Sequence, residues 1–261
     1  MRPHHAAAIA KLGEHFSRQD GYLAVIVGGS IAKGVESDNA DIDAIIVVTD
    51  EMYSSRLRDN ALTYFSTEFC DYPMGYVDGK IVDKGYLRAA AGRGNEPTRA
   101  AFQDSILPYC ADPEIEHLVR RIPVYPKHEQ REKMRSFYAQ FEAAYWYLGE
   151  ALRRGDRYLL LHSASALALY GGRLILAHNE ILFPYHKLFM GELARAPAKP
   201  EGLMDLMGAL LADPTEESAR AFHDSVRAFR QWADPPEPWN LRFIRDTELA
   251  WLDGTPFIGD S

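Results

Sequence analysis

Residues 23–48 read LAVIVGGSIAKGVESDNADIDAIIVV, and this stretch carries the clearest structural and chemical signals of the chain. Its two apolar runs predict strands over residues 23–27 and 44–48. A glycine-rich turn follows the first strand, and Asp41 and Asp43 precede the second. The stretch therefore predicts a strand–turn–strand unit with a tight turn and two carboxylates at the same end.

The turn consists of Gly28, Gly29 and Ser30. Backbone N–H groups approach phosphate oxygens closely only where no side chain intrudes, and glycine reaches the backbone angles that such a turn needs. The Ser30 hydroxyl adds a donor, and a helix that begins near Ile31 would add the positive end of its dipole. Since no Ser or Thr follows Lys33, the Walker motif is excluded. We expect a phosphate-binding turn of another kind.

Asp41 and Asp43 lie two positions apart, so on a strand their side chains point to the same face. The residues that follow are apolar on both faces, which is typical of a central, buried strand. Two unpaired carboxylates there would repel each other and be costly to desolvate, and a divalent cation removes both costs. The alternative is a pair of solvated aspartates. With the turn, the pair indicates metal-assisted phosphoryl or nucleotidyl transfer.

The segment from Val25 to Val48 resembles the signature of the DNA polymerase beta-type nucleotidyltransferase superfamily, which is Gly-Ser, about ten residues, then Asp-hydrophobic-Asp. The chain is also similar to bacterial stand-alone nucleotidyltransferases of the aminoglycoside (streptomycin-type) adenylyltransferase kind and to their uncharacterised relatives. Those proteins pair this N-terminal domain with a helical C-terminal domain. One departure is Ala40, where many members have Ser, but that position is not a ligand in the pattern.

The resemblance implies a third acidic residue on a strand beside the Asp-x-Asp strand. A hairpin is predicted with strands over residues 74–77 and 80–83 and with Asp78-Gly79 as its turn. We therefore prefer Asp83, which would ligate the metal or accept a proton from the attacking hydroxyl. Asp78 is the alternative, but Asp-Gly is a typical turn pair.

The composition changes near residues 122–128, where Pro123 and Pro126 indicate a connector. Beyond it the apolar spacing predicts helices over residues 129–153, 156–178, 185–195, 201–212 and 215–233. The predicted fold class is α+β, a small nucleotidyltransferase α/β domain with a mixed sheet followed by an all-α helical bundle. The predicted domains cover residues 1–126 and 127–261.

Residues 178–187 join two predicted helices and gather several polar side chains. The relatives named above carry a similar segment that faces the nucleotide. The resemblance therefore implies that Lys187 contacts triphosphate oxygens and that Tyr185 positions the nucleotide. The alternative is a helix connector with solvated polar residues.

The formal net charge of −8 argues against a general nucleic-acid surface and permits a cationic partner. Cys70 and Cys110 match no metal spacing, so we expect reduced thiols in a cytoplasmic protein. We expect neither a signal peptide nor a run of transmembrane length. Acidic residues of the second half would offer partners to an amine-rich acceptor, among them Glu142, Glu150, Glu180 and Glu192.

The sequence thus predicts a metal-dependent nucleotidyltransferase that moves a nucleoside monophosphate from a nucleoside triphosphate, with ATP favoured, to a hydroxyl of a small molecule. The sequence does not name the acceptor, but a cationic aminoglycoside-like compound is favoured over nucleic acid, and pyrophosphate is released. Asp41 and Asp43 would bridge two Mg²⁺ ions, and Asp83 would hold one of them. The alternatives are a non-catalytic nucleotide-binding regulator, an antitoxin-like protein, or an enzyme that nucleotidylates a protein. The preferred base and the oligomeric state stay open.

Overall fold

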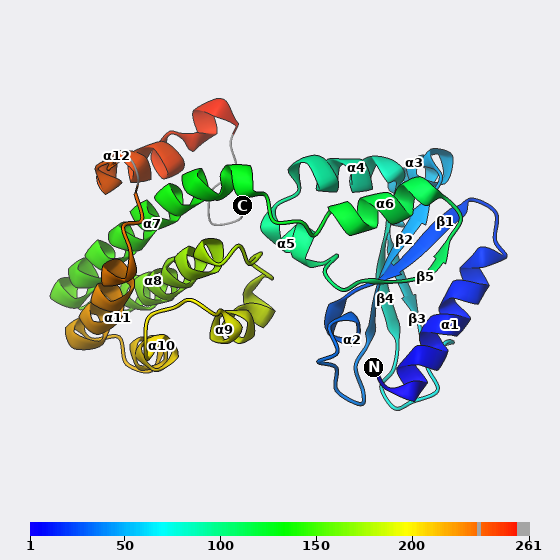
Figure 1. Cartoon of the computed structure of the whole chain (residues 1–261), viewed down its shortest axis with the longest axis horizontal. Coiled ribbons are helices and arrows are strands. Elements are labelled where there is room, and N and C mark those ends of the chain that lie inside the picture. The colour runs from blue at the N-terminus through cyan, green and yellow to red at the C-terminus, as the bar shows by residue number, and fades with distance from the viewer. Residues whose placement is uncertain (234–235, 255–261) are drawn as a thin grey trace. The chain divides into compact units, whose positions relative to one another are not determined.

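The computed structural model describes residues 1–233 and 236–254. The chain divides into two compact units, Met1–Val124 and Tyr125–Ser261, which are described separately (Figure 1). The first unit combines helices with a five-stranded mixed sheet, and the described residues of the second unit form helices and no strand. The predicted α+β fold class is confirmed.

The sheet of the first unit places the Asp-x-Asp strand at its centre. The strand order is β3-β4-β2-β1-β5. Strand β2 pairs antiparallel with β1 and parallel with β4, while β3 and β5 form the edges. The bounds are β1 (Tyr22–Val27), β2 (Ile42–Val48), β3 (Thr63–Ser66), β4 (Val77–Val82) and β5 (Ile106–Cys110). The two strands predicted around the glycine turn are therefore confirmed, with β2 beginning two residues earlier than expected.

The hairpin predicted over residues 74–83 is wrong, because β4 runs without interruption through Asp78 and Gly79. Gly79 pairs with Ala44 of β2, and a Cβ at this glycine would lie 3.1 Å from the Ala44 carbonyl oxygen. The glycine thus permits close approach of two strands instead of forming a turn. The antiparallel neighbour of β4 is β3, which lies earlier in the chain.

Helices cover both faces of this sheet. On one face α1 (Pro3–Ser17) packs its buried Leu12 and Phe16 into an apolar cluster with Ile46. On the other face a second cluster contains residues of the sheet together with Leu87 and Leu118. Leu87 belongs to α4 (Lys84–Arg93) and Leu118 to α6 (Pro113–Arg121), and α5 (Glu96–Ala100) contacts α4. Two short helices, α2 (Gly29–Ala32) and α3 (Asp50–Arg58), follow β1 and β2.

The second unit is built on a long helical hairpin whose apolar residues form one core. Phe137, Phe141, Leu167, Leu174 and Phe222 are fully buried in it. The helices are α7 (Lys127–Arg154), α8 (Arg157–His178), α9 (His186–Arg195), α10 (Leu203–Ala212), α11 (Glu216–Phe229) and α12 (Trp239–Phe243). A π-helix, Ile244–Glu248, and a 3₁₀-helix, Ala250–Asp253, follow. The five predicted helices are confirmed as α7 to α11.

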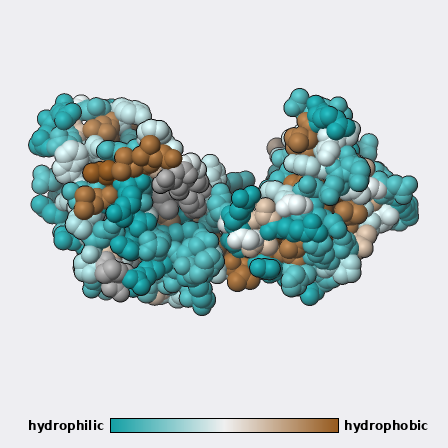
Figure 2. All heavy atoms as spheres, turned by 90° about the horizontal axis from the view of Figure 1, so that it is seen from above, coloured by the Kyte–Doolittle hydropathy of each residue, from teal (hydrophilic) through white to brown (hydrophobic). Residues whose placement is uncertain are grey.

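No apolar run of transmembrane length was expected, but α8 is such a run. Among the described residues it is the one helix long and apolar enough to cross a membrane by length and composition. However, 61% of its most apolar window is buried inside the protein, as is typical of a core helix. On the face drawn in Figure 2 most residues are hydrophilic, and the hydrophobic residues lie in separate groups.

A contact between a partly buried carboxylate and a buried imidazole in the second unit makes its stability depend on pH. His223 Nε2 of α11 lies 3.2 Å from Glu142 Oε2 of α7, and the imidazole stacks on Tyr145. Burial alone would raise the pKa of Glu142, but hydrogen bonds from His223 and Tyr138 outweigh it, so the pKa is lowered. A lowered folded-state pKa stabilises the protein above the ordinary value of 4.5, and this contribution is lost as the pH falls through the folded value.

We therefore expect Glu142→Gln to destabilise the chain near pH 7, because the substitution removes the carboxylate that His223 contacts. The difference in unfolding free energy between wild type and variant should shrink as the pH falls below the ordinary carboxyl range. Urea denaturation followed by circular dichroism between pH 3 and 7 measures it. A difference that stays constant across this range would contradict the assignment.

Candidate functional site

The glycine turn lies directly against the Asp-x-Asp segment. The Gly28 N–H donates to the Asp43 carbonyl oxygen at 2.9 Å, which ties the end of β1 to the start of β2. Gly29 has a φ of +68°, and a Cβ built on it would lie 1.8 Å from Asp43 Oδ2. Only glycine fits between this turn and the carboxylate. The turn and Asp43 therefore form one site.

Asp78 is the acidic residue that the fold brings to this site. In the parallel pairing of β2 with β4, Asp43 is the register partner of Asp78. Partnered residues of parallel strands project from the same face, and neighbouring strands lie about 4.8 Å apart. Both side chains are exposed, and Asp41, which precedes β2, is partly exposed. A ligand can therefore reach all three carboxylates from solvent.

The pKa of the Tyr76 phenol is raised by three carboxylates of this site. The negative charge of Asp41 is the largest cause that raises the pKa of the Tyr76 phenol, followed by desolvation and a hydrogen bond to Asp41. The charges of Asp78 and Asp43 raise it further. Anionic neighbours oppose loss of the phenolic proton, so the hydroxyl stays a donor. All three carboxylates, Asp41, Asp43 and Asp78, therefore act electrostatically on one hydroxyl.

Asp83 is not brought together with Asp41 and Asp43. Strand β4 ends at Val82, which pairs with Val47, so Asp83 follows at the opposite end of the strand. Five residues of extended chain separate it from Asp78, a span of about 16 Å. Its carboxylate caps α4 and accepts from the Tyr86 N–H at 2.7 Å. The prediction of Asp83 within a strand beside Asp-x-Asp is therefore wrong, and Asp78 occupies that position.

Two aromatic residues beside the carboxylates also escaped the sequence analysis. Phe65 of β3 is the register partner of Asp78 and is 67% exposed, and its ring lies 5.4 Å from that of Tyr76. An exposed aromatic ring on a strand edge offers a flat surface for stacking.

The position of Asp78 within a strand has a signal in the sequence. Val77, Ile81 and Val82 are buried on either side of Asp78, and this apolar pattern could have identified β4.

A short helix follows the glycine turn, where a helix beginning near Ile31 was considered. It is α2, which begins at Gly29 and spans four residues, with Gly28 as its N-cap. One turn carries little of the dipole of a long helix, because the macrodipole sums over aligned peptide units. Its first N–H groups nevertheless have no partner within the helix. Ser30 is partly exposed at this turn. The phosphate-binding prediction thus depends on individual N–H groups and the Ser30 hydroxyl.

The donor set at this site suits Mg²⁺ only in part. In residues 1–233 and 236–254 no group of three or more His, Cys, Asp or Glu side chains is arranged to hold a metal ion. Mg²⁺, however, commonly takes one or two carboxylates and completes its octahedron with water and substrate phosphates. Asp41, Asp43 and Asp78 supply carboxylates of this kind beside the glycine turn. They fit a metal that arrives with a phosphate ligand.

Tyr185 and Lys187 lie in the second unit, at the start of α9. Both side chains are exposed, and Tyr185 has a φ of 72° at the N-cap position. The Tyr185 ring lies 4.8 Å from that of His186 and contacts Phe183 at longer range. Locally the segment is a connector between α8 and α9. Contact of these two residues with a nucleotide stays a prediction.

Comparison with known proteins adds little to this geometry. No family model matches the chain, and no curated protein matches it. Among solved structures the chain is similar to a nucleotidyltransferase-like protein from Exiguobacterium sibiricum, with a TM-score of 0.49 and 10% sequence identity. The similarity covers 85% of this chain and 73% of that one. The resemblance to aminoglycoside adenylyltransferases stays a prediction, and the function of the chain has to be inferred from the site itself.

Proposed function

We propose that the first unit is a nucleotidyltransferase domain that transfers a nucleoside monophosphate from a nucleoside triphosphate to a hydroxyl group. The observation that carries this proposal is the position of Gly29 against Asp43, with Asp78 in register on the next strand. A turn able to hold phosphate and a cluster of carboxylates thereby meet at one end of the sheet. Nucleotidyl transfer needs both, because it moves a highly charged group.

The residues have distinct roles in this proposal. The Gly29 backbone N–H and the Ser30 hydroxyl hold the β- and γ-phosphates, whereas the Gly28 N–H is already bonded to the Asp43 carbonyl oxygen. Asp41, Asp43 and Asp78 hold Mg²⁺. When bound, magnesium neutralises negative charge on the phosphates and orients them.

The acceptor oxygen attacks the α-phosphorus, the bond to the β-phosphate oxygen breaks, and pyrophosphate leaves. A carboxylate of the cluster takes the acceptor proton. Phe65 offers a stacking surface beside the cluster. Asp78 replaces Asp83 in this assignment, because only Asp78 is in register with Asp43.

The acceptor class is restricted by charge. A net charge of −8 disfavours a polyanionic acceptor, so we favour a small hydroxyl compound. The acidic residues that favoured an amine-rich acceptor each have a cationic partner or a histidine within the chain. The pairs are Glu142 with His223 and Arg227, Glu150 with Arg153 and Arg154, Glu180 with Lys127, and Glu192 with Arg195. An aminoglycoside therefore has weaker support than a hydroxyl compound in general.

Incubation with Mg²⁺ and each nucleoside triphosphate, against a panel of hydroxyl compounds, tests the proposal. Pyrophosphate release together with an acceptor mass shift equal to one nucleoside monophosphate is the expected result. Nucleotide binding without pyrophosphate release would favour the non-catalytic regulator instead. A mass shift on an added protein, with none on any small molecule, would favour protein nucleotidylation.

Ser30→Ala is expected to weaken triphosphate binding by about 1–2 kcal/mol, the scale of one hydrogen bond to a charged group. Isothermal titration calorimetry with a non-hydrolysable triphosphate and Mg²⁺ measures the effect. Ser37→Ala is the matched control, since Ser37 is an exposed serine in the same connection between β1 and β2. Equal affinities of wild type and Ser30→Ala would show that the hydroxyl does not contact the phosphates.

A further inference from the structure

The second unit contains a cavity that the proposed nucleotide site does not use. Its volume is about 500 Å³, within the range of small-molecule sites. The cavity lies among α7, α8, α9 and the C-terminal segment, and much of its lining is apolar or aromatic. Tyr147, Tyr170, Phe189, Met190 and Phe243 contribute to its walls. A cavity of this size and lining holds an apolar ligand more favourably than it holds water.

One polar atom in the cavity wall lacks a partner. Ser163 of α8 is 1% exposed, lines the cavity, and its Oγ has no hydrogen-bond partner among the described residues. A buried hydroxyl without a partner is costly, and nearly all such groups are satisfied by protein, water or ligand. A serine within a helix commonly bonds back to the carbonyl four residues earlier, but the Ser163 hydroxyl does not make this bond. The Ser163 hydroxyl is therefore left for a group that enters the cavity.

The lining also restricts the charge of the ligand. Within the described ranges the lining includes no Asp, Glu, Lys or Arg side chain. Desolvating an ionised ligand without an opposite charge would be unfavourable. The polar groups present are hydroxyls, the amide of Gln140, and the rings of His162 and His186. The cavity therefore suits a neutral molecule that makes a few hydrogen bonds.

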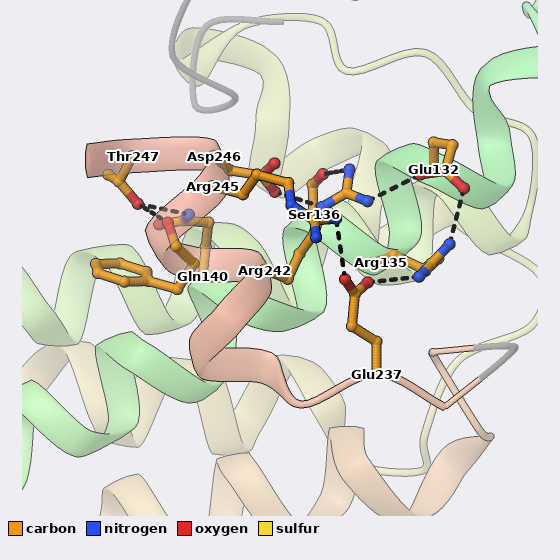
Figure 3. A network of polar contacts seen from close by, with 10 residues as sticks. Glu132, Arg135, Ser136, Gln140, Glu237, Arg242, Arg245, Asp246 and Thr247 are labelled. Carbon is orange, nitrogen blue, oxygen red and sulfur yellow. Dashed lines mark hydrogen bonds and ion pairs between the residues drawn. The ribbon is translucent and has the colours of Figure 1, made fainter. Parts of the chain in front are cut away.

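Residues near the C-terminus complete one wall of the cavity. Phe243 of α12 and Thr247 of the π-helix line it, and Gln140 Nε2 donates to Thr247 Oγ1 at 3.4 Å. Figure 3 shows how polar contacts hold this segment on α7. Arg242 donates to Ser136 Oγ at 2.6 Å and to Glu132 Oε2 at 2.8 Å, and Arg135 pairs with Glu237. The wall is thus fixed by directional contacts, and π-helical turns occur often at functional sites.

We propose that this cavity binds a neutral, largely aromatic small molecule, with the Ser163 hydroxyl hydrogen-bonded to a polar group of that molecule. The proposal does not depend on nucleotidyl transfer by the first unit. It combines the volume, the aromatic lining, the lack of Asp, Glu, Lys and Arg side chains among the described lining residues, and the unpartnered hydroxyl of one site. Aromatic rings of the ligand pack on Phe189 and Phe243, and its polar group replaces the missing partner of Ser163.

A displacement titration on the full chain tests the site. N-phenyl-1-naphthylamine, a neutral aromatic dye whose fluorescence rises in apolar surroundings, serves as the probe, and saturable binding of one molecule per chain is expected. Wild type should bind 2-naphthol roughly three- to ten-fold more tightly than 2-methylnaphthalene, because only the former bonds to Ser163. In Ser163→Ala this preference should disappear. Charged 2-naphthoate should compete poorly with both proteins.

Two further variants complete the design. Ala166→Phe places a ring in the cavity from a partly exposed position of α8 and should abolish dye binding, with the fold checked by circular dichroism. Ser225→Ala, on α11 and outside the lining of this cavity, should leave the naphthol preference unchanged. If Ala166→Phe does not fold, the preference for 2-naphthol over 2-methylnaphthalene in wild type and Ser163→Ala still tests the proposal. Absence of saturable dye binding by wild type, or an unchanged naphthol preference in Ser163→Ala, would overturn the proposal.

Discussion

Asp43→Asn is expected to reduce nucleotidyl transfer by at least about 10²–10³-fold while the chain stays folded. Asp43 is the carboxylate that lies against the glycine turn and beside Asp78. The amide keeps the shape of the side chain but removes the negative charge that would hold the metal in the proposed site. Removal of one charge from a cluster of like charges should also keep or slightly raise the melting temperature without metal. Pyrophosphate release and thermal denaturation measure the two effects.

A matched pair of substitutions decides which residue is the third carboxylate. Asp78→Asn should lose transfer as Asp43→Asn does, because Asp78 is in register with Asp43. Asp83→Asn should keep transfer and stability, because Asn caps a helix about as well as Asp. Near-normal turnover by Asp78→Asn, together with loss of transfer in Asp83→Asn, would restore the assignment made from sequence. Near-normal turnover by Asp43→Asn would contradict the proposed site as a whole.

Gly29→Val is expected to destabilise the chain by about 2–4 kcal/mol and to abolish triphosphate binding. Two costs combine at this position. The φ of +68° is strained for any residue with a Cβ, most of all for a β-branched one, and that Cβ would overlap Asp43 Oδ2. Urea denaturation gives the free energy of unfolding, and calorimetry gives the nucleotide affinity.

Substitution of Gly34 measures the backbone strain without the steric overlap. Gly34 has a φ of +66°, but a Cβ built on it meets nothing within 4 Å. Gly34→Ala should therefore cost only the strain of the backbone, about 1 kcal/mol, whereas Gly29→Ala should cost more and should weaken nucleotide binding. Equal effects of the two alanine substitutions on stability and binding would show that the contact between Gly29 and Asp43 has no functional role.

The sequence by itself determined the features that depend on neighbouring residues. Apolar runs of the right length identified β1 and β2 around the glycine turn, and apolar spacing identified α7 to α11. These signals are local, because periodicity and turn chemistry act over a few residues. The short separation between Ser30 and Asp41 also indicated that the turn and the carboxylates belong together. The contact between Gly29 and Asp43 has the geometry that this interpretation requires.

Only the tertiary structure showed which of Asp78 and Asp83 lies beside Asp43. Asp-Gly usually forms a turn, but here the pair continues a strand, because Gly79 permits close packing against Ala44. The register of β4 on β2 joins residues that are far apart in sequence, and no local pattern encodes it. The same holds for the partners of the glutamates in the second unit and for the cavity around Ser163. Each depends on which helices pack together, and the hydrophobic core of the whole second unit determines that packing.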